Sequence, residues 1–241
     1  MTDQANSPQH SVAGRKPIVA IDGPAGAGKS TIARFLAQRF GLLNLETGAM
    51  YRAFALKALR QDIALDASSA LERLAAETTI SLQPGETENR VLLDGEDVTG
   101  FIRNPAVTEA ASRVSVFPSI RAWMVRLQQQ MGAQGGVVME GRDIGTVVFP
   151  QADVKIFLDA APEVRGIRRF EQMGAAAAAV QQEQVIRDLR ARDERDRTRA
   201  DSPLKPAPDA VLLDSTHMTL DEVVQAAAAV VAARIDEPAL K

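Results

Sequence analysis

The sequence predicts an α/β fold in which a parallel five-stranded sheet carries helices on both faces, together with a small inserted module of antiparallel strands and a helical lid. Three observations support this prediction. Short apolar runs alternate with helical patterns, as in parallel sheets that are covered on both faces. A glycine-rich turn joins the first run to the first helix. One stretch, residues 71–102, breaks the alternation and carries the turn signals of hairpins.

The five expected strands are short and apolar, and the first is rich in β-branched residues, which favours strands buried within a sheet. They are residues 18–22 (IVAID), 42–45 (LLNL), 136–140 (GVVME), 154–159 (VKIFLD) and 210–214 (AVLLD). Because helical patterns lie between the strands, we expect the strands to run parallel.

The expected helices are marked by apolar residues at helical spacing and by residues that start or stop helices. They span residues 29–40 and 49–60, begin at Asn104-Pro105 and Phe117-Pro118, and follow Pro162 and Thr219. Gly41 suits the left-handed backbone that often ends a helix. Asn104 is a good cap with Pro105 at the first helical position, and Thr219 with Glu222 forms a capping box.

The chain length suits one α/β domain with an inserted module. We expect residues 1–15 to be a flexible tail and residues 16–236 to form a single domain. Within that domain we place the insert at about residues 65–103 and the lid at about residues 165–190. The alanine run at 175–179 favours helix and is predicted to belong to this mobile lid.

Composition excludes several classes of function. Hydrophobic residues make up 46% and charged residues 24% of the 241 residues, as is typical of globular enzymes. A net charge of −3 and an aromatic content of 4% disfavour nucleic acid as a partner. With no cysteine and only two histidines, disulfides, thiolate chemistry and Cys- or His-rich metal sites are not expected. The polar N-terminus and the lack of a long apolar run predict a cytoplasmic protein without membrane contact.

The residues from Gly23 to Ser30 match the phosphate-binding pattern G-x-x-x-x-G-K-[ST], and the strand and helix that this pattern requires flank them. Glycines let the backbone wrap closely around phosphates, and the helix N-terminus favours an anion. Lys29 is expected to reach the β- and γ-phosphates of a nucleotide, and the Ser30 hydroxyl to ligate Mg²⁺. A glycine-rich turn that binds nothing is the alternative, which the flanking elements disfavour.

This loop alone does not separate GTPases, ATPase motors and small-molecule kinases. The sequence lacks the N-K-x-D motif of guanine recognition, which disfavours a GTPase. The small size, with room for an insert and a lid, favours a kinase.

Two charged segments are candidates for an acceptor site. In RDERDRTR, Arg192, Asp196 and Arg199 are spaced i, i+4 and i+7, so on a helix they face the same way. Such a segment is either a solvated charged helix, which explains the mixture of signs, or a phosphate-clamping face, which explains the preference for Arg over Lys; the segment alone favours neither. In GRDIG, Arg142 and Asp143 follow the third strand, where α/β sheets bind ligands; a structural ion pair is the alternative.

Over about residues 17–216, the sequence resembles the bacterial cytidylate kinases. Four segments carry the resemblance: ETGAMYR (46–52), AASRVSVFPSIR (110–121), EGRDIGTVVFP (140–150) and RDERDRTR (192–199). The resemblance implies a P-loop kinase that transfers the γ-phosphoryl group of ATP to CMP and dCMP with the help of Mg²⁺. It also implies that the insert is the module that binds the nucleoside monophosphate, and that the enzyme is a monomer.

By this resemblance, the acceptor is held by Thr47, Arg52, Ser112, Arg121, Arg142, Asp143, Arg192, Asp196 and Arg199. Arg142 would contact phosphate, Asp196 the sugar hydroxyl, and Asp143 the cytosine amino group. Ser112 and Arg121 would read the cytosine edge, although each taken alone reads as an ordinary surface residue. The family usually has Asp where this chain has Glu46, and often where it has Glu140, so neither residue is assigned a role.

The residues that the resemblance implies for ATP are Gly23, Pro24, Ala25, Gly26, Ala27, Gly28, Lys29, Ser30, Thr31, Arg165 and Arg168. Arg165 and Arg168 would meet phosphate or stack near adenine, although arginines on a helix are commonly solvated. The expected catalytic residues are Lys29, Arg142 and Arg192, and Ser30 is the expected metal ligand.

Phosphoryl transfer requires in-line placement and neutralised charge more than covalent help from protein groups. The acceptor phosphate needs no general base, which agrees with the absence of histidine from every motif. Three alternatives stay open: a small kinase for AMP, UMP or shikimate, an ATP-dependent conformational switch, and a nucleic-acid-binding ATPase. The arginine-rich segments disfavour the switch, and the acidic net charge disfavours the nucleic-acid-binding ATPase.

Overall fold

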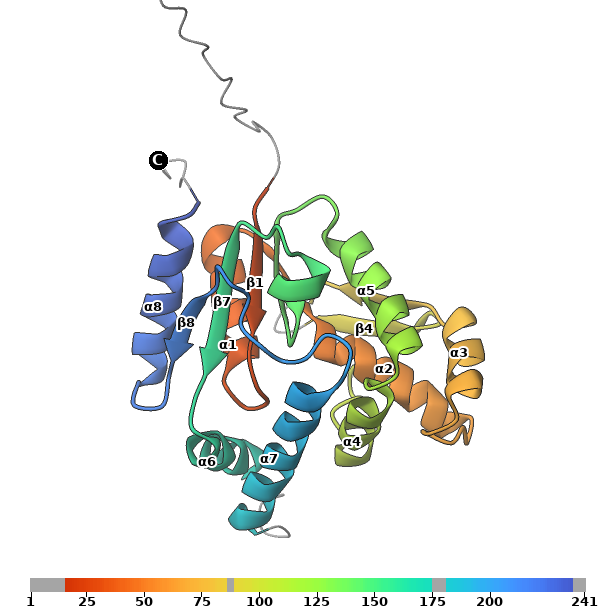
Figure 1. Ribbon diagram of the computed structural model, residues 1–241. Helices are drawn as coiled ribbons and strands as arrows, with labels where there is room; N and C mark the ends of the chain where they lie inside the picture. Colours follow the sequence, from red (N-terminus) through yellow and green to blue (C-terminus); the bar gives the residue numbers. More distant parts are fainter. Residues whose placement is uncertain (1–15, 86–88, 175–180, 236–241) are drawn as a thin grey trace, which may run out of the picture.

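The main sheet of the protein has five parallel strands in the order β2-β6-β1-β7-β8. The computed structural model describes residues 16–85, 89–174 and 181–235 (Figure 1). The strands are β1 (Ile18–Asp22), β2 (Leu43–Glu46), β6 (Val137–Gly141), β7 (Val154–Asp159) and β8 (Val211–Asp214). The predicted five-stranded parallel sheet is confirmed.

Helices cover both faces of this sheet. Successive side chains of a strand point to opposite faces, so β1 contributes to an apolar cluster on each face. Val19 and Ile21 of β1 pack with α1 (Lys29–Phe40) and α8 (Leu220–Ala232). Ala20 belongs to the cluster on the other face, which includes residues of α5 (Pro118–Gly132) and of a single π-helical turn (Ile144–Val148). All residues of the central strand β1 are buried, so the loop that follows its carboxyl end starts inside the molecule.

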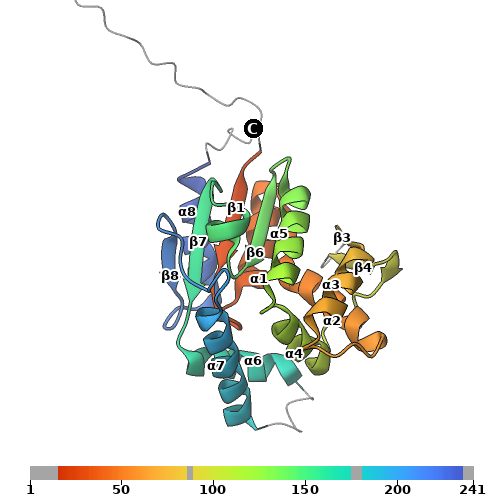
Figure 2. The same ribbon diagram turned by 45° about the vertical axis from the view of Figure 1, so that its right-hand side comes forward.

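A second, antiparallel sheet contains β3 (Ile80–Gln83), β4 (Arg90–Leu93) and β5 (Glu96–Asp97), which confirms the predicted hairpin structure. It lies beside the main sheet in Figure 2. One apolar cluster joins it to α2 (Thr47–Arg60), α3 (Ser68–Ala76), α4 (Pro105–Val114) and α5. Helix α3 was not predicted from the sequence. The predicted boundaries of the insert, 65–103, stay a prediction, since the hairpins share their core with helices on both sides.

Most of the predicted helix ends agree with the structure. Gly41 ends α1 with a left-handed backbone, and the Asn104 side chain accepts from the Ala106 N–H at 2.8 Å. The capping box of Thr219 and Glu222 is present at α8. The prediction for α2 was wrong by two residues: it begins at Thr47, directly after β2, because a tertiary hydrogen bond from the Thr47 hydroxyl fixes its first turn.

Helices α6 (Pro162–Met173) and α7 (Gln182–Thr198) lie side by side beyond the carboxyl ends of the strands (Figures 1 and 2). The predicted lid helix at 175–179 falls outside the described residues. Arg199 follows the last residue of α7 and has an extended backbone. The predicted helical face therefore includes only Arg192 and Asp196, and Arg199 lies just beyond the helix. The chain turns there because Arg199 Nε donates to the Ser202 carbonyl at 2.7 Å. No helix in the described parts of the chain is long and apolar enough to cross a membrane.

Candidate active site

The phosphate loop Gly23–Ser30 joins the end of β1 to the start of α1, so the strand–loop–helix context of the motif is present. Gly23 has φ of 149°, and a Cβ atom on it would lie 1.9 Å from the Leu158 carbonyl oxygen. Any other residue would therefore displace the loop from β7. Gly28 also has a positive φ, 98°, where α1 begins. The loop thus depends on glycine for close approach as well as for backbone freedom.

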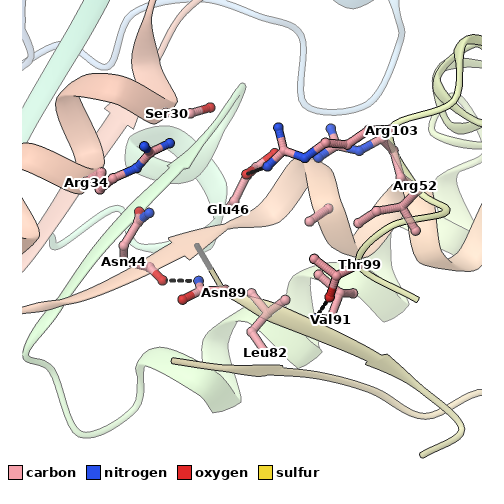
Figure 3. A pocket seen from close by; sticks show the side chains of 12 residues that line it. Ser30, Arg34, Asn44, Glu46, Arg52, Leu82, Asn89, Val91, Thr99 and Arg103 are labelled. Atoms are coloured by element: carbon pink, nitrogen blue, oxygen red, sulfur yellow. Dashed lines mark hydrogen bonds and ion pairs between the residues drawn. The ribbon is translucent and has the colours of Figure 1, made fainter. Parts of the chain in front are cut away.

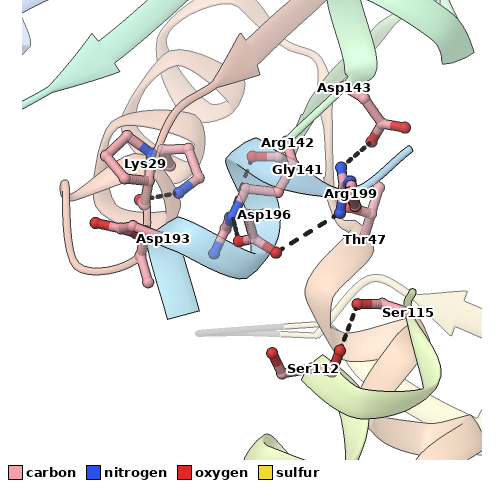
Figure 4. A network of polar contacts seen from close by, with 12 residues as sticks. Lys29, Thr47, Ser112, Ser115, Gly141, Arg142, Asp143, Asp193, Asp196 and Arg199 are labelled. Carbon is pink, nitrogen blue, oxygen red and sulfur yellow. Dashed lines mark hydrogen bonds and ion pairs between the residues drawn. The ribbon is translucent and has the colours of Figure 1, made fainter. Parts of the chain in front are cut away.

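Lys29 is the first residue of α1, and its side chain is buried against the loop (Figure 4). Its Nζ donates to the Pro24 carbonyl oxygen at 2.7 Å. Burial, reinforced by the nearby Arg142 guanidinium, lowers the pKa of Lys29 to about 7. The lowered pKa means that the surroundings of Lys29 disfavour its charged form. A bound anion would stabilise that form, so the site favours an anionic ligand.

The Ser30 hydroxyl donates to a carboxylate oxygen of Glu140, at the carboxyl end of β6. Burial, together with the negative charge of Glu46, raises the pKa of Glu140. The Ser30 hydroxyl of α1 and the Glu140 carboxylate of β6 therefore meet beside the loop and offer the oxygen ligands that a hard divalent cation requires. Thr31 is exposed in the first turn of α1, where its backbone N–H donates to the Gly28 carbonyl at 3.1 Å.

Asp196 of α7 is the centre of an arginine cluster (Figure 4). Arg142 Nε donates to its Oδ2 at 2.8 Å, and Arg199 Nη1 lies 3.6 Å from its Oδ1. Although burial acts to raise it, the charges of Arg142, Arg192 and Arg199 hold the pKa of Asp196 below its ordinary value. Burial and the neighbouring Arg142 lower the pKa of Arg192 to about 10. One carboxylate thus faces three guanidinium groups, and the excess positive charge favours an anion.

A second buried ion pair joins Asp143, just after β6, to Arg121 of α5. The Arg121 Nη1 also donates to the Ser115 carbonyl at 3.3 Å, and its guanidinium lies 5.9 Å from the centre of the Tyr51 ring. The other oxygen of Asp143, Oδ1, lies 4.0 Å from Arg199 Nη2. Asp143 is therefore held by arginine on one side and leaves a weakly engaged oxygen on the other.

Asp22, the last residue of β1, holds the turn that carries Arg142 and Asp143. Its two carboxylate oxygens accept from the Ile144 and Gly145 N–H groups at 2.8 and 2.7 Å. Burial outweighs these two hydrogen bonds and raises the pKa of Asp22 to about 6. Asp22, which directly precedes the phosphate loop, thus also anchors the GRDIG turn.

The ETGAMYR segment contributes Thr47 and Arg52. The Thr47 hydroxyl donates to the Glu140 carbonyl at 2.7 Å, so it ties α2 to the end of β6. Arg52 pairs with Glu46, whose other oxygen lies 3.8 Å from Arg103. Glu46, Arg52 and Arg103 line a small pocket between the main sheet and the hairpins (Figure 3).

Several buried polar atoms in the described residues have no hydrogen-bond partner, and five of the eight belong to predicted acceptor residues. The five are Arg52 Nε, Ser112 Oγ, Arg121 Nε, Arg192 Nε and Arg199 Nη2. Buried polar groups are nearly always hydrogen-bonded in native proteins. These five buried polar groups are therefore available to a polar ligand.

The two arginines predicted to contact ATP are engaged with the protein itself. Arg165 is only 2% exposed and pairs with Asp193, while its Nε donates to the Ala160 carbonyl at 2.7 Å. Arg168 donates to the Ser215 carbonyl at 2.8 Å. Both arginines therefore lie among protein partners, so their contact with ATP stays a prediction. Among the predicted acceptor residues, ion pairs and charge interactions link Arg121, Arg142, Asp143, Arg192, Asp196 and Arg199.

Sequence reasoning assigned no role to four further residues of the site. Tyr51 lies within ETGAMYR, and Glu46 and Glu140 were set aside because the family usually or often has Asp there. Asp193 lies in the charged segment RDERDRTR, where no pattern distinguishes it from its neighbours. The available signal for Glu46 and Glu140 was their position: Glu46 is the last residue of β2 and Glu140 the second-last of β6, at the strand ends where α/β sheets bind ligands.

The family described as cytidylate kinase matches residues 19–233. The chain belongs to the cytidylate kinase family. It is 52% identical over 210 residues to the cytidylate kinase of Pelotomaculum thermopropionicum, covering 87% of this chain and 93% of that protein. It is 50% identical over 223 residues to the cytidylate kinase of Solibacter usitatus, covering 92% and 94% of the two chains. The resemblance inferred from the four segments is confirmed.

Among solved structures, the chain is similar to the shikimate kinase of Acinetobacter baumannii, with a TM-score of 0.42 and 16% identity. The similarity covers 94% of this chain and 96% of that one. It is too weak to bear on the acceptor, whereas membership of the cytidylate kinase family rests on sequence over most of the chain.

Proposed function

We propose that this protein transfers the γ-phosphoryl group of ATP to CMP and dCMP, producing CDP or dCDP and ADP. Membership of the cytidylate kinase family supports the reaction. The observation that carries the acceptor site is the cluster of unpartnered donors on Arg52, Ser112, Arg121, Arg192 and Arg199. A nucleotide with a phosphate, sugar hydroxyls and a polar base edge can satisfy donors of all these kinds.

The donor nucleotide is assigned to the phosphate loop. Backbone N–H groups at the start of α1 would bind its β- and γ-phosphates, with the helix dipole favouring the charge. Lys29 would leave the Pro24 carbonyl and follow the transferred phosphoryl group. The arriving phosphate raises the pKa of Lys29, because an anion favours the charged form.

The acceptor is assigned to the arginine cluster and the buried Arg121–Asp143 pair. Arg52, Arg142 and Arg192 would neutralise the acceptor phosphate, while Asp196 would accept from a sugar hydroxyl. The weakly engaged oxygen of Asp143, Oδ1, would accept from the cytosine amino group. Uracil carries a carbonyl oxygen there, so two acceptors would face each other unpaired, and UMP would be a poor substrate.

Catalysis in this assignment is placement and charge neutralisation. The acceptor phosphate is already nucleophilic, so no side chain needs to remove its proton. Two anions must nevertheless approach in line, and the excess of guanidinium groups around Asp196 offsets their repulsion. Burial of the same groups would exclude water and so suppress hydrolysis of ATP.

Mg²⁺ fits the oxygen atoms that Ser30 and Glu140 bring together beside the loop. No cluster of three or more His, Cys, Asp or Glu side chains that could hold a metal occurs in the described residues. A magnesium site that is shared with nucleotide phosphates needs only one or two protein oxygen ligands, so the pair is sufficient. When bound, the ion would neutralise charge on the phosphates of ATP.

Glu140→Gln is expected to raise the Mg²⁺ concentration for half-maximal velocity by about tenfold, since ligand or outer-shell carboxylates contribute that much to metal affinity. Initial rates over a Mg²⁺ titration, at saturating ATP and CMP, measure the effect. Glu171→Gln, which removes an exposed carboxylate on α6, is the matched control. An unchanged Mg²⁺ requirement in Glu140→Gln would show that this carboxylate does not serve the metal.

The proposed function is tested by ADP release from ATP with CMP, dCMP, UMP, AMP or shikimate as acceptor. CMP and dCMP should support rapid turnover, and the other three should support little. Equal turnover with UMP would keep the kinase but remove the role given to Asp143. ADP release that is independent of any acceptor would contradict the proposal and favour a switch or an ATPase.

A further inference from the structure

A buried ion pair from α6 and α7 holds both backbone polar groups of one residue of the phosphate loop, Ala25. Arg165 Nη1 lies 2.6 Å from Asp193 Oδ2 and donates to the Ala25 carbonyl at 2.9 Å. Asp193 Oδ1 accepts from the Ala25 N–H at 3.3 Å. The carbonyl before Gly26 and the N–H after Pro24 are therefore both fixed by the same pair of side chains.

Apolar packing supports the same contact. Ala25 forms a small cluster with Val185 and Leu189 of α7, against which Phe170 of α6 packs. A Cβ atom on Gly166 would lie 2.2 Å from Ile186 Cγ1, so the two helices approach closely beside the pair. The loop, α6 and α7 thus form one packed unit at the carboxyl end of the sheet.

The geometry does not suit direct contact between Arg165 and a nucleotide. The side chain is only 2% exposed, and its donors already serve Asp193, Ala25 and Ala160. Asp193, in turn, directs the Ala25 N–H toward α7, so this donor does not point into the phosphate cradle. Both charged groups therefore act on the loop backbone. Because α7 also carries Arg192 and Asp196, the contact sets the distance between the donor loop and the acceptor residues.

We propose that Arg165 and Asp193 are positioning residues, whose ion pair orients the backbone of Ala25 and places the acceptor residues of α7 against the ATP-binding loop. The inference rests on the proposed function. It differs from the role in which Arg165 touches phosphate or adenine, because it assigns the effect to loop geometry and to the coupling of two sites.

The test compares Asp193→Ala with a matched control on the same two helices. Arg190 of α7 and Glu163 of α6 also form an ion pair, but their side chains are 56% and 53% exposed and do not touch the loop. Exposed pairs contribute little. Glu163→Gln should therefore leave kcat, both dissociation constants and Tm close to the wild-type values.

In Asp193→Ala, we expect kcat to fall by about 10²-fold, the loss that small misplacement of reacting groups can cause. The dissociation constant of ATP, measured by calorimetry without acceptor, should rise by about tenfold, because part of the loop's preorganisation is lost. The dissociation constant of CMP, measured without ATP, should stay close to wild type. Asp193→Glu should recover part of kcat because it restores the charge.

Equal loss of affinity for ATP and CMP would indicate general disruption of the fold and overturn the proposal, as would unchanged kinetics. If Asp193→Ala does not fold, the double variant Arg165→Met with Asp193→Leu replaces the pair by apolar groups, a change that buried ion pairs often tolerate. Its kcat should stay low even if its Tm is normal; recovery of wild-type kcat would contradict positioning.

Failure of the proposed function would be visible separately. In that case wild-type protein would release no ADP in response to CMP, whatever the variants do. The ATP dissociation constants of wild type, Asp193→Ala and Glu163→Gln would still report whether the pair shapes the loop.

Discussion

Replacing Lys29 by methionine is expected to lower kcat by about 10³-fold, since removal of one preorganised charge from the transition state has effects of that order. Lys29 is the buried cation of the phosphate loop and donates only to the Pro24 carbonyl in the structure. Methionine preserves length and removes charge, so the loop should keep its shape. Single-turnover rates with saturating ATP and CMP measure the chemical step directly.

The same substitution should not destabilise the free enzyme. Burial lowers the pKa of Lys29 from 10.5 to about 7, so its charged form costs stability in the fold. This cost is fully present below about pH 7 and disappears as the pH rises through 10.5, where lysine is also neutral in the unfolded chain. Lys29→Met should therefore be more stable than wild type near neutral pH, and this advantage should shrink toward alkaline pH.

Urea unfolding of wild type and Lys29→Met at several pH values measures the difference in free energy. Lys205→Met, which removes an exposed lysine, is the control and should change neither kcat nor the pH dependence. Near-normal turnover in Lys29→Met would contradict the assignment of Lys29 to the transferred phosphoryl group. A lower stability of Lys29→Met at neutral pH would contradict the cost assigned to its burial.

Asp143→Asn is expected to lower kcat/KM for CMP by about 10²-fold, because a charge-assisted hydrogen bond to the base is lost. The ratio of kcat/KM for CMP to that for UMP should fall further, since the amide group of asparagine can donate to the uracil oxygen that the carboxylate repels. The KM for ATP should remain close to wild type, because the proposed role of Asp143 is in the acceptor site.

Asp143→Asn should affect the stability of the protein as well as its base preference, because Asp143 forms a buried ion pair with Arg121. Arg121 would keep its charge without a carboxylate, so the variant should also be less stable, and its Tm should fall. Asp62→Asn serves as the control because Asp62 is exposed and has a left-handed backbone that asparagine accepts. A lower Tm with an unchanged preference for CMP over UMP would leave Asp143 a structural residue only.

Local patterns were sufficient for most of the fold. β1 and β7 have the bounds that their apolar runs predicted, and α1 spans the predicted residues from Lys29 to the residue before Gly41. The π-helical turn after Asp143 and helix α3 were not predicted. The turn depends on two hydrogen bonds to Asp22, which no local pattern indicates.

The candidate site was predicted in parts. The glycine-rich loop carries its own physical signature, whereas the roles of Ser112 and Arg121 came from family resemblance, because isolated polar residues on helices have no distinguishing pattern. The sequence could not indicate that Glu140 meets Ser30, or that Arg165 faces Asp193 and the loop backbone. Nor could it indicate that α7 ends before Arg199.

The sequence by itself determined the five strands of the main sheet, most of the helices, the phosphate loop and the family, because periodicity, caps and motifs are properties of neighbouring residues. The tertiary structure decided which charges meet. Ala25 and Asp193 are 168 positions apart, and Arg142 and Asp196 are 54 apart. Such pairs form only when the strands and helices have packed, since burial is what makes each charge require a specific partner.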